Sequence, residues 1–308
     1  MPYPPQRTRV GFQAVTTIAQ LIGLLILPIG CELIHPDHQP EPAPPAPAVE
    51  GRELIARAAP PTTTPGKYAT RRGYYVFYTD FESDKNDPMF AELEDLPDQV
   101  FGELRLPPSN TVVQVFLFDT QERYERFMRL RYKDLPPRRA YFLQEPGMVG
   151  KDDLNIYTWM GNHIQTDLRH ELTHALLHGV LKDVPLWLDE GLAGYFELPP
   201  ANEGVNPQHL EILRRGPFQP DLARLEKLEK VKQMGKPEYR EAWAWVHLML
   251  RSDPAAKKVL QDYLQLLRTN SNPGPLLPRL RDAVLDPEQD LVAHLEKTEL
   301  PKPQARGK

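Results

Sequence analysis

The stretch His170-Glu171-Leu172-Thr173-His174, together with Trp187-Leu188-Asp189-Glu190-Gly191, decides the expected fold and chemistry. His170 and His174 are four residues apart, so on a helix their imidazoles lie on one face, one turn apart. Two imidazoles in this geometry can hold one tetrahedral Zn²⁺, and Glu190 supplies a third ligand. The fourth position then stays open, as in catalytic zinc sites. Glu171 can take a proton from water held at the metal.

The sequence around both motifs favours helices. Residues 167–179 carry apolar side chains at 168, 172, 175 and 176, a helical spacing, and Asp167 and Gly179 suit the start and the end of that helix. A second helix is expected to begin at Pro185. Its small residues, Gly191, Ala193 and Gly194, predict close packing against the first helix, which would bring Glu190 to the metal.

Two further histidines are not expected to bind the metal. His178 is one more turn along the same helix, but the rise over eight residues is about 12 Å, so residues 170, 174 and 178 cannot converge on one ion. We interpret His178 as a helix-end residue near the carbonyl dipole. His163 precedes the helix and is interpreted as a loop residue.

The two motifs resemble those of the gluzincin zinc metallopeptidases, in the broad peptidase MA-like superfamily. The resemblance rests on residues 170–174 and on Pro185-Leu-Trp-Leu-Asp-Glu-Gly-Leu-Ala-Gly-Tyr-Phe196. The chain is similar to a group of uncharacterised bacterial proteins, a domain of unknown function, that carry both motifs. It is also similar to the Trp-Leu-x-Glu-Gly segment of zinc aminopeptidases. The motifs cover residues 163–197, and the wider pattern covers residues 72–296.

The resemblance implies one Zn²⁺ ion held by His170, His174 and Glu190, with Glu171 as general base and a peptide or protein as substrate. Gly194 stands where relatives often carry a polar or acidic residue, so no role is carried over to it. The segment between His174 and Glu190 is shorter than in the aminopeptidases, and no Gly-x-Met-x-Asn segment precedes it. Aminopeptidase activity is therefore not implied.

The first 31 residues predict export. Arg7 and Arg9 precede an uncharged stretch over residues 10–30, and Cys31 follows. Gly30-Cys31 resembles the cleavage site of a bacterial lipoprotein, with Cys31 as the lipidated residue, although Pro28 stands where Leu is usual. The alternative is an uncleaved N-terminal membrane anchor, because this stretch can just span a bilayer. Either interpretation predicts an extracytoplasmic, membrane-anchored protein.

Composition gives the remaining organisation of the 308 residues. The net charge of −5 provides no basic surface, so no nucleic-acid partner is expected. Cys31 is the single cysteine, which excludes an intramolecular disulfide. The chain contains 34 prolines, and those clustered after Cys31 predict a Pro-rich tether over residues 32–70. The predicted catalytic domain covers residues 71–298, in a β/α half (71–180) and a helical half (181–298), before a tail over residues 299–308.

Local patterns predict an α+β, zincin-like fold with a small mixed sheet, the metal-site helix and a mostly helical C-terminal half. The expected strands cover residues 74–79, 111–118, 141–143 and 155–159, and the last is the candidate cleft-edge strand that an extended peptide could join. The expected helices cover residues 88–104 (broken near Pro97), 120–128, 207–215, 220–233, 237–251, 254–268 and 287–297.

These features predict peptide-bond hydrolysis in which Glu171 activates water at the zinc. Tyr239 and His247 are candidate donors to the tetrahedral oxyanion, from a pool that also contains Tyr195 and Tyr157. Asp189 is a candidate to orient a ligand histidine. Two alternatives stay open: a non-catalytic zincin-fold binding protein with a vestigial site, and a zinc amidase acting on cell-wall peptides.

Overall fold

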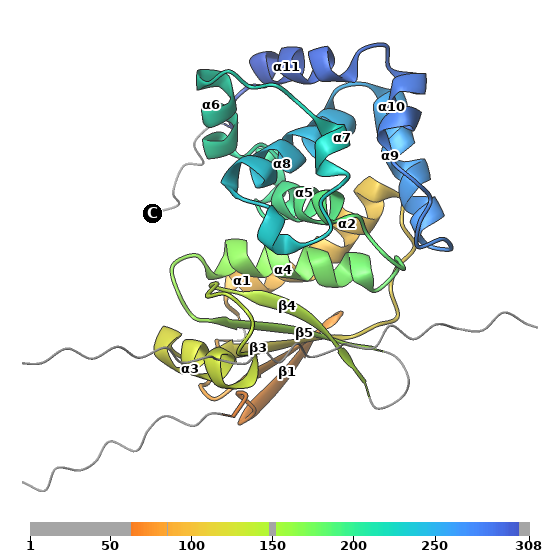
Figure 1. Ribbon diagram of the computed structural model, residues 1–308. Coiled ribbons are helices and arrows are strands. Elements are labelled where there is room, and N and C mark those ends of the chain that lie inside the picture. The colour runs from red at the N-terminus through yellow and green to blue at the C-terminus, as the bar shows by residue number, and fades with distance from the viewer. Residues whose placement is uncertain (1–62, 85, 148–151, 302–308) are drawn as a thin grey trace, which may run out of the picture. The chain divides into compact units, whose positions relative to one another are not determined.

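A computed structural model describes residues 63–84, 86–147 and 152–301 (Figure 1). Within these residues one mixed sheet of five strands has the order β1-β2-β3-β5-β4. Strand β3 pairs in parallel with β2 and β5, whereas β1–β2 and β4–β5 are antiparallel hairpins. The strands are β1 (Tyr68–Arg72), β2 (Tyr75–Thr79), β3 (Val113–Phe118), β4 (Tyr141–Pro146) and β5 (Asp152–Trp159). The predicted export segment, residues 1–31, lies outside the described residues, as do residues 32–62 of the predicted tether.

The edge of the sheet differs from the sequence expectation. Residues 155–159 belong to β5, which lies between β3 and β4, so the prediction that they form the cleft edge is wrong. Five consecutive residues of β5, from Leu154 to Thr158, are buried, as expected for a strand covered on both faces. The edge beside the metal helix is β4, the outer strand of the β4–β5 hairpin.

Strand β1 was not expected from the sequence. It begins at Tyr68, within the segment assigned to the tether, and its side chains are half-buried or exposed. The sequence Tyr-Ala-Thr-Arg-Arg has no apolar alternation, so its strand conformation depends on the ladder to β2. Gly73, with φ of 52°, makes the tight connection between the two strands.

Helices on the N-terminal half follow the expected pattern. The segment 88–104 forms α1 (Pro88–Glu94) and α2 (Leu96–Leu104), with Pro97 in the first turn of the second helix. Helix α3 (Gln121–Arg131) begins after Thr120, whose hydroxyl accepts a hydrogen bond from the backbone N–H of Arg123. It contacts β3 and β5, on the sheet face away from α4 (Figure 1).

The metal-motif helix, α4 (Ile164–His178), lies between the sheet and the helical half (Figure 1). It contacts β3, β4 and β5 on one side and α5 (Leu186–Phe196) on the other. Gly179 ends α4 as predicted, but Asp167 is not its cap. The helix begins after His163, and Asp167 lies in the first turn, where its carboxylate is 2.7 Å from the guanidinium of Arg139.

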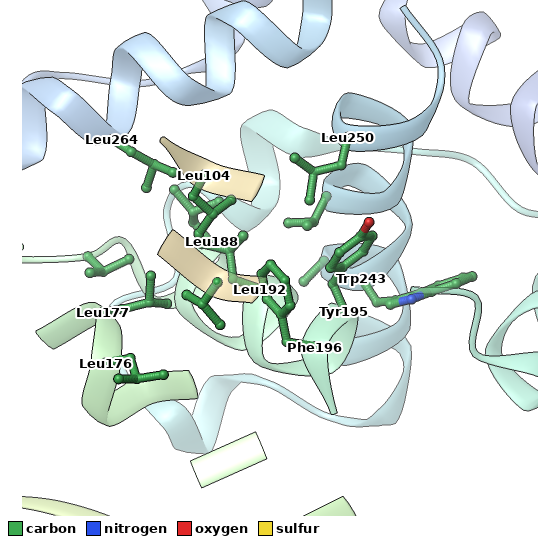
Figure 2. Close-up of a cluster of buried hydrophobic side chains, with 14 of the residues drawn as sticks. Leu104, Leu176, Leu177, Leu188, Leu192, Tyr195, Phe196, Trp243, Leu250 and Leu264 are labelled. Atoms are coloured by element: carbon green, nitrogen blue, oxygen red, sulfur yellow. The ribbon is translucent and has the colours of Figure 1, made fainter. Parts of the chain in front are cut away.

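The two glycines of α5, Gly191 and Gly194, face α8 (Lys236–Arg251) rather than α4, which corrects the sequence expectation for them. A Cβ atom on Gly191 would lie 2.6 Å from the carbonyl oxygen of Ala242, so only glycine permits this approach. A Cβ atom on Gly194 would lie 3.8 Å from Trp243. Figure 2 shows the apolar core around this contact, with labelled side chains from five helices: Leu104, Leu176, Leu177, Leu188, Leu192, Tyr195, Phe196, Trp243, Leu250 and Leu264.

The rest of the C-terminal half is helical. Four expected helices are confirmed: α6 (Pro207–Arg215), α8, α9 (Pro254–Leu267) and α11 (Pro287–Lys297). The single helix predicted over residues 220–233 is wrong: the segment forms only α7 (Leu222–Leu225) and a 3₁₀ turn over Val231–Gln233. Only Leu222 and Leu225 within α7 are buried, so few apolar contacts support a longer helix. A further 3₁₀ turn (Pro200–Asn202) and α10 (Leu277–Ala283) were not expected.

The fold class is the expected one: α+β, with a small mixed sheet, the motif helix and a mostly helical second half.

A buried arginine in α4 joins this helix to α5 and α2. Arg169 is 1% exposed, and its guanidinium donates to the carbonyl of Phe196 (3.0 Å) and to Gln99 (2.9 Å).

Within the described ranges, we find no helix with the length and apolar character needed to cross a bilayer.

Candidate metal centre

Three side chains from α4 and α5 converge at one point. His170 Nε2 and His174 Nε2 are 3.3 Å apart, and Glu190 Oε2 lies 3.5 Å from the first and 3.6 Å from the second. The spacing of four residues on α4 brings the two imidazoles together, and the close packing of α5 supplies the carboxylate. The structure thus brings together the three predicted ligands, and they could hold one metal ion.

The dimensions of this triangle fit zinc. A tetrahedral ion with bonds of about 2.0–2.1 Å separates its ligand atoms by about 3.3 Å. Glu190 Oε2 is also buried without a hydrogen-bond partner, and a cation at the centre of the triangle would satisfy it. Two imidazoles and one carboxylate form a donor set typical of catalytic zinc sites, in which a fourth position is left for water or substrate.

Each imidazole has a carboxylate behind it. His174 Nδ1 lies 3.0 Å from Asp189 Oδ2, the position expected for an orienting residue. His170 Nδ1 lies 3.1 Å from Glu197 Oε2, and Asn206 donates to the other oxygen of Glu197 (2.9 Å). Carboxylates in such positions fix the tautomer and the orientation of a ligand histidine.

Glu197 was missed in the sequence analysis. It follows Glu190 by seven residues, two helical turns, which places both on one side of α5 and its C-terminal cap. That spacing could have indicated Glu197 from the sequence, but whether its carboxylate reaches His170 depends on how α5 packs against α4. His178 forms no part of the triangle: its Nε2 lies 3.1 Å from Asp189 Oδ2, at the last residue of α4.

The charges around the triangle favour a cation. Burial lowers the pKa of His170, but its contacts with Glu190 and Glu197 outweigh burial and raise that pKa to about 10. His174 follows the same pattern: Asp189 and Glu190 outweigh burial and raise its pKa well above the usual value. Burial raises the pKa of Glu190, and the two imidazoles more than reverse this effect. A divalent cation would displace the protons that these imidazoles otherwise hold.

The candidate base Glu171 lies between the motif helix and the edge strand. Its Oε2 accepts a hydrogen bond from the backbone N–H of Phe142 in β4, at 2.7 Å. Burial is the largest influence on its pKa, which is raised, with His170 and His174 acting in the opposite direction. One carboxylate oxygen is therefore held against the edge strand, which fixes where the base points.

His170 and Glu171 open onto a cleft of about 610 Å³. Its walls come from the segment before β4, from the first half of α4 and from the start of α6. His163, interpreted as a loop residue, directly precedes α4 at this cleft and makes no side-chain capping hydrogen bond. The lining residues are Arg138, Arg139, Ala140, His163, Thr166, Asp167, His170, Glu171, Glu197, Leu198, Asn206, Pro207, Gln208 and His209.

The two candidate oxyanion donors lie in different places. The hydroxyl of Tyr239 is 3.4 Å from Glu190 Oε1 and accepts a hydrogen bond from Arg138 (3.1 Å), so it lies beside the triangle. His247 does not: it is 2% exposed, and its Nδ1 is 2.8 Å from His294 Nε2. The structure therefore does not bring His247 to the triangle, because its part of α8 faces α11.

The two tyrosines of the wider pool are also directed elsewhere. The ring of Tyr195 packs near Gly204 and His247 in the helical half. The hydroxyl of Tyr157 contacts Tyr132 and Glu145 on the sheet face that α3 covers. Tyr239 is therefore the one member of the predicted pool that the structure places at the metal centre.

Comparisons with known proteins give distant structural matches. No family model matches this chain, and no curated protein does. A crystal structure of a mutant M1 zinc metallopeptidase from Deinococcus radiodurans is 17% identical, with a TM-score of 0.43 over 78% of this chain. A two-domain M1 zinc metallopeptidase mutant bound to L-tryptophan is 19% identical, with a TM-score of 0.41 over 74% of this chain. The chain spans about half of the length of these proteins, 54% and 50% respectively.

Proposed function

We propose that this protein is a zinc-dependent peptidase that acts outside the cytoplasm and is anchored to a membrane through its N-terminus. One observation carries the hydrolytic part of the proposal. Three ligand atoms lie 3.3–3.6 Å from one another at a cleft, and a carboxylate that can act as a base, Glu171, stands in the same cleft. A purely structural zinc site would need neither the cleft nor the base.

The edge strand supports a peptide as substrate. Strand β4 has one neighbour in the sheet, and its Phe142 N–H reaches Glu171. An extended peptide can add to such an edge through main-chain hydrogen bonds, which would place a scissile bond beside the base. The cleft volume of about 610 Å³ suits a few residues of a peptide chain rather than a folded domain.

The residues divide the chemistry between them. His170, His174 and Glu190 would hold the zinc ion, which supplies Lewis acidity and lowers the pKa of water that it binds. Glu171 takes the proton of the attacking water and passes it to the leaving amine. Tyr239 donates a hydrogen bond to the oxygen of the tetrahedral carbon, where negative charge develops. Asp189 and Glu197 keep the imidazoles oriented.

Replacing Glu171 tests this proposal. We expect Glu171→Gln to bind zinc with unchanged stoichiometry and to lose peptide cleavage by at least about 10³-fold, because the amide cannot accept the proton. Glu125→Gln, an exposed carboxylate on α3, is the matched control and should cleave like wild type. Equal behaviour of the wild type and Glu171→Gln on a broad peptide library would support the non-catalytic binding protein instead.

The same assay separates the peptidase from the cell-wall amidase. Purified muropeptides and unfolded proteins are supplied in parallel, and products are identified by mass spectrometry. Cleavage confined to protein substrates supports the peptidase. Cleavage confined to the amide bonds of muropeptides supports the amidase, with the same roles for Glu171 and Tyr239.

The membrane anchor is tested at Cys31. If this residue is lipidated, Cys31→Ser should abolish incorporation of labelled fatty acid and release the protein from the membrane fraction. A Cys31→Ser protein that stays in the membrane at full precursor length would support the uncleaved anchor over residues 10–30 instead.

A further inference from the structure

Arg138 is the cation of the cleft that lacks a carboxylate partner. Its neighbour Arg139 also lines the cleft, but that guanidinium is paired with Asp167 at 2.7 Å. No carboxylate in the part of the chain that the structure describes lies within ion-pair distance of Arg138. Its guanidinium instead donates a hydrogen bond to the hydroxyl oxygen of Tyr239, at 3.1 Å.

The direction of this hydrogen bond determines where the hydroxyl hydrogen of Tyr239 can donate. A guanidinium has donors and no acceptor, so the phenol oxygen must accept from Arg138. The hydroxyl hydrogen of Tyr239 is then left to donate elsewhere. Its nearest acceptor is Glu190 Oε1, at 3.4 Å, which is long for a hydrogen bond between two oxygens. A substrate oxygen developing negative charge beside Glu190 would be the better acceptor.

The bond joins two walls of the site. Tyr239 lies in the first turn of α8, and Arg138 lies just before the edge strand β4. The main chain around Arg138 is held in place, because its carbonyl accepts from the hydroxyl of Tyr124 (3.0 Å) and the next carbonyl accepts from Thr158 (3.1 Å). Arg138 thus projects from a fixed backbone and can hold the phenol at a defined position.

We propose that Arg138 is a positioning residue that orients Tyr239 as the hydrogen-bond donor to the tetrahedral oxyanion. The inference rests on the proposed hydrolytic function and adds to it a residue that the sequence motifs do not contain. Preorganised donors stabilise a transition state because they need no reorganisation when charge appears. Without the guanidinium, the phenol can rotate and its hydrogen can turn to solvent or to Glu190.

The test compares Arg138→Gln, Tyr239→Phe and the double variant, all loaded with zinc, with Arg129→Gln as the matched control. Arg129 is an exposed arginine on α3, paired with Glu125, and it does not line the cleft. We expect Arg138→Gln and Tyr239→Phe each to lower kcat by about 10²-fold, with KM changed less than threefold. The double variant should have a kcat only slightly below that of either single variant, because both substitutions remove the same Arg138–Tyr239 interaction. Arg138→Lys, which keeps one donor, should recover part of the loss.

A binding measurement gives a second readout. A phosphinic peptide mimics the tetrahedral intermediate, and calorimetry measures its affinity. We expect its affinity to fall in Arg138→Gln by about the same factor as kcat, while the affinity of the substrate peptide, measured on the Glu171→Gln background, stays within threefold. Zinc content should be unchanged in every variant.

Several results would overturn the inference. These are a kcat of Arg138→Gln equal to that of Arg129→Gln, losses of the two single variants that multiply in the double variant, or a raised KM with kcat unchanged. The last result would assign Arg138 to uniform substrate binding. A zinc-loaded wild type that neither cleaves peptides nor binds the phosphinic peptide would overturn both this inference and the proposed function.

Discussion

Two histidine pairs in this protein have similarly close ring nitrogens, but carboxylates surround one pair and an aromatic ring lies beside the other. In the pair at the cleft, His170 and His174 bring their Nε2 atoms within 3.3 Å, and three carboxylates surround them. In the pair between α8 and α11, His247 Nδ1 lies 2.8 Å from His294 Nε2, beside the ring of Trp243. No carboxylate within the described ranges forms an ion pair with this second pair.

The surroundings determine the charge that each pair can carry. Carboxylates raise the pKa of His170 to about 10 against the effect of burial. Burial, with no carboxylate to oppose it, lowers the pKa of His247 to about 3 and that of His294 to about 4. A close pair of imidazoles therefore does not define a metal site. The acids around it do, because they allow positive charge to be buried.

The largest expected effect follows from removal of a ligand from the first pair. We expect His174→Ala to weaken zinc binding by on the order of 10³-fold, since three protein ligands share a binding free energy of about 10 kcal/mol or more. His247→Ala, the same substitution in the second pair, should leave zinc affinity within about twofold of wild type. Competition with a chromogenic chelator measures both. A similar loss in the two variants would contradict the assignment of the metal to the cleft pair.

A smaller effect is expected from the acids behind the ligands. Glu197→Gln and Asp189→Asn should each weaken zinc binding by about 10- to 100-fold, because each loosens the orientation of one imidazole. Glu211→Gln on α6, an exposed carboxylate paired with Arg215, is the control. Unchanged zinc affinity in both test variants would show that the three ligands alone define the site.

The smallest expected effect concerns the second pair and pH. The pKa of His247 is lower in the folded protein than its unfolded value of about 6.5, so the unfolded state binds more protons at mildly acidic pH. Its contribution to stability is present above that value and is lost as pH falls. Between pH 7 and pH 5.5 we expect a loss of ~1 kcal/mol from this residue. Urea unfolding of wild type and His247→Gln at both pH values measures it, and an equal pH response in the two proteins would contradict it.

The sequence predicted those parts of the site that depend on local spacing. His170, Glu171 and His174 share one helix, and the periodicity of residues 167–179 identifies that helix without tertiary information. Bringing Glu190 to the triangle needed only the next helix to pack closely. Most helices of the second half were predicted for the same reason, because each carries its own apolar stripe.

Features that depend on pairing between distant segments were not predictable. The order of β4 and β5 in the sheet depends on which strand pairs with β3, and both strands have suitable residues. Tyr239 and His247 lie on one helix, so only the packing of α8 against its neighbours separates a site residue from a core residue. Arg138 belongs to no motif, and its hydrogen-bond partner Tyr239 lies 101 positions along the chain.

The contact between Gly191 and the carbonyl of Ala242 has a consequence for the distance between Glu190 and Tyr239. Glu190 precedes this glycine, and Tyr239 lies three positions before Ala242, so the close approach of the two backbones sets the distance between the carboxylate and the phenol. That approach is possible because residue 191 carries only a hydrogen atom in place of a side chain. A methyl group at this position would push the two helices apart and increase the distance without altering either reactive group.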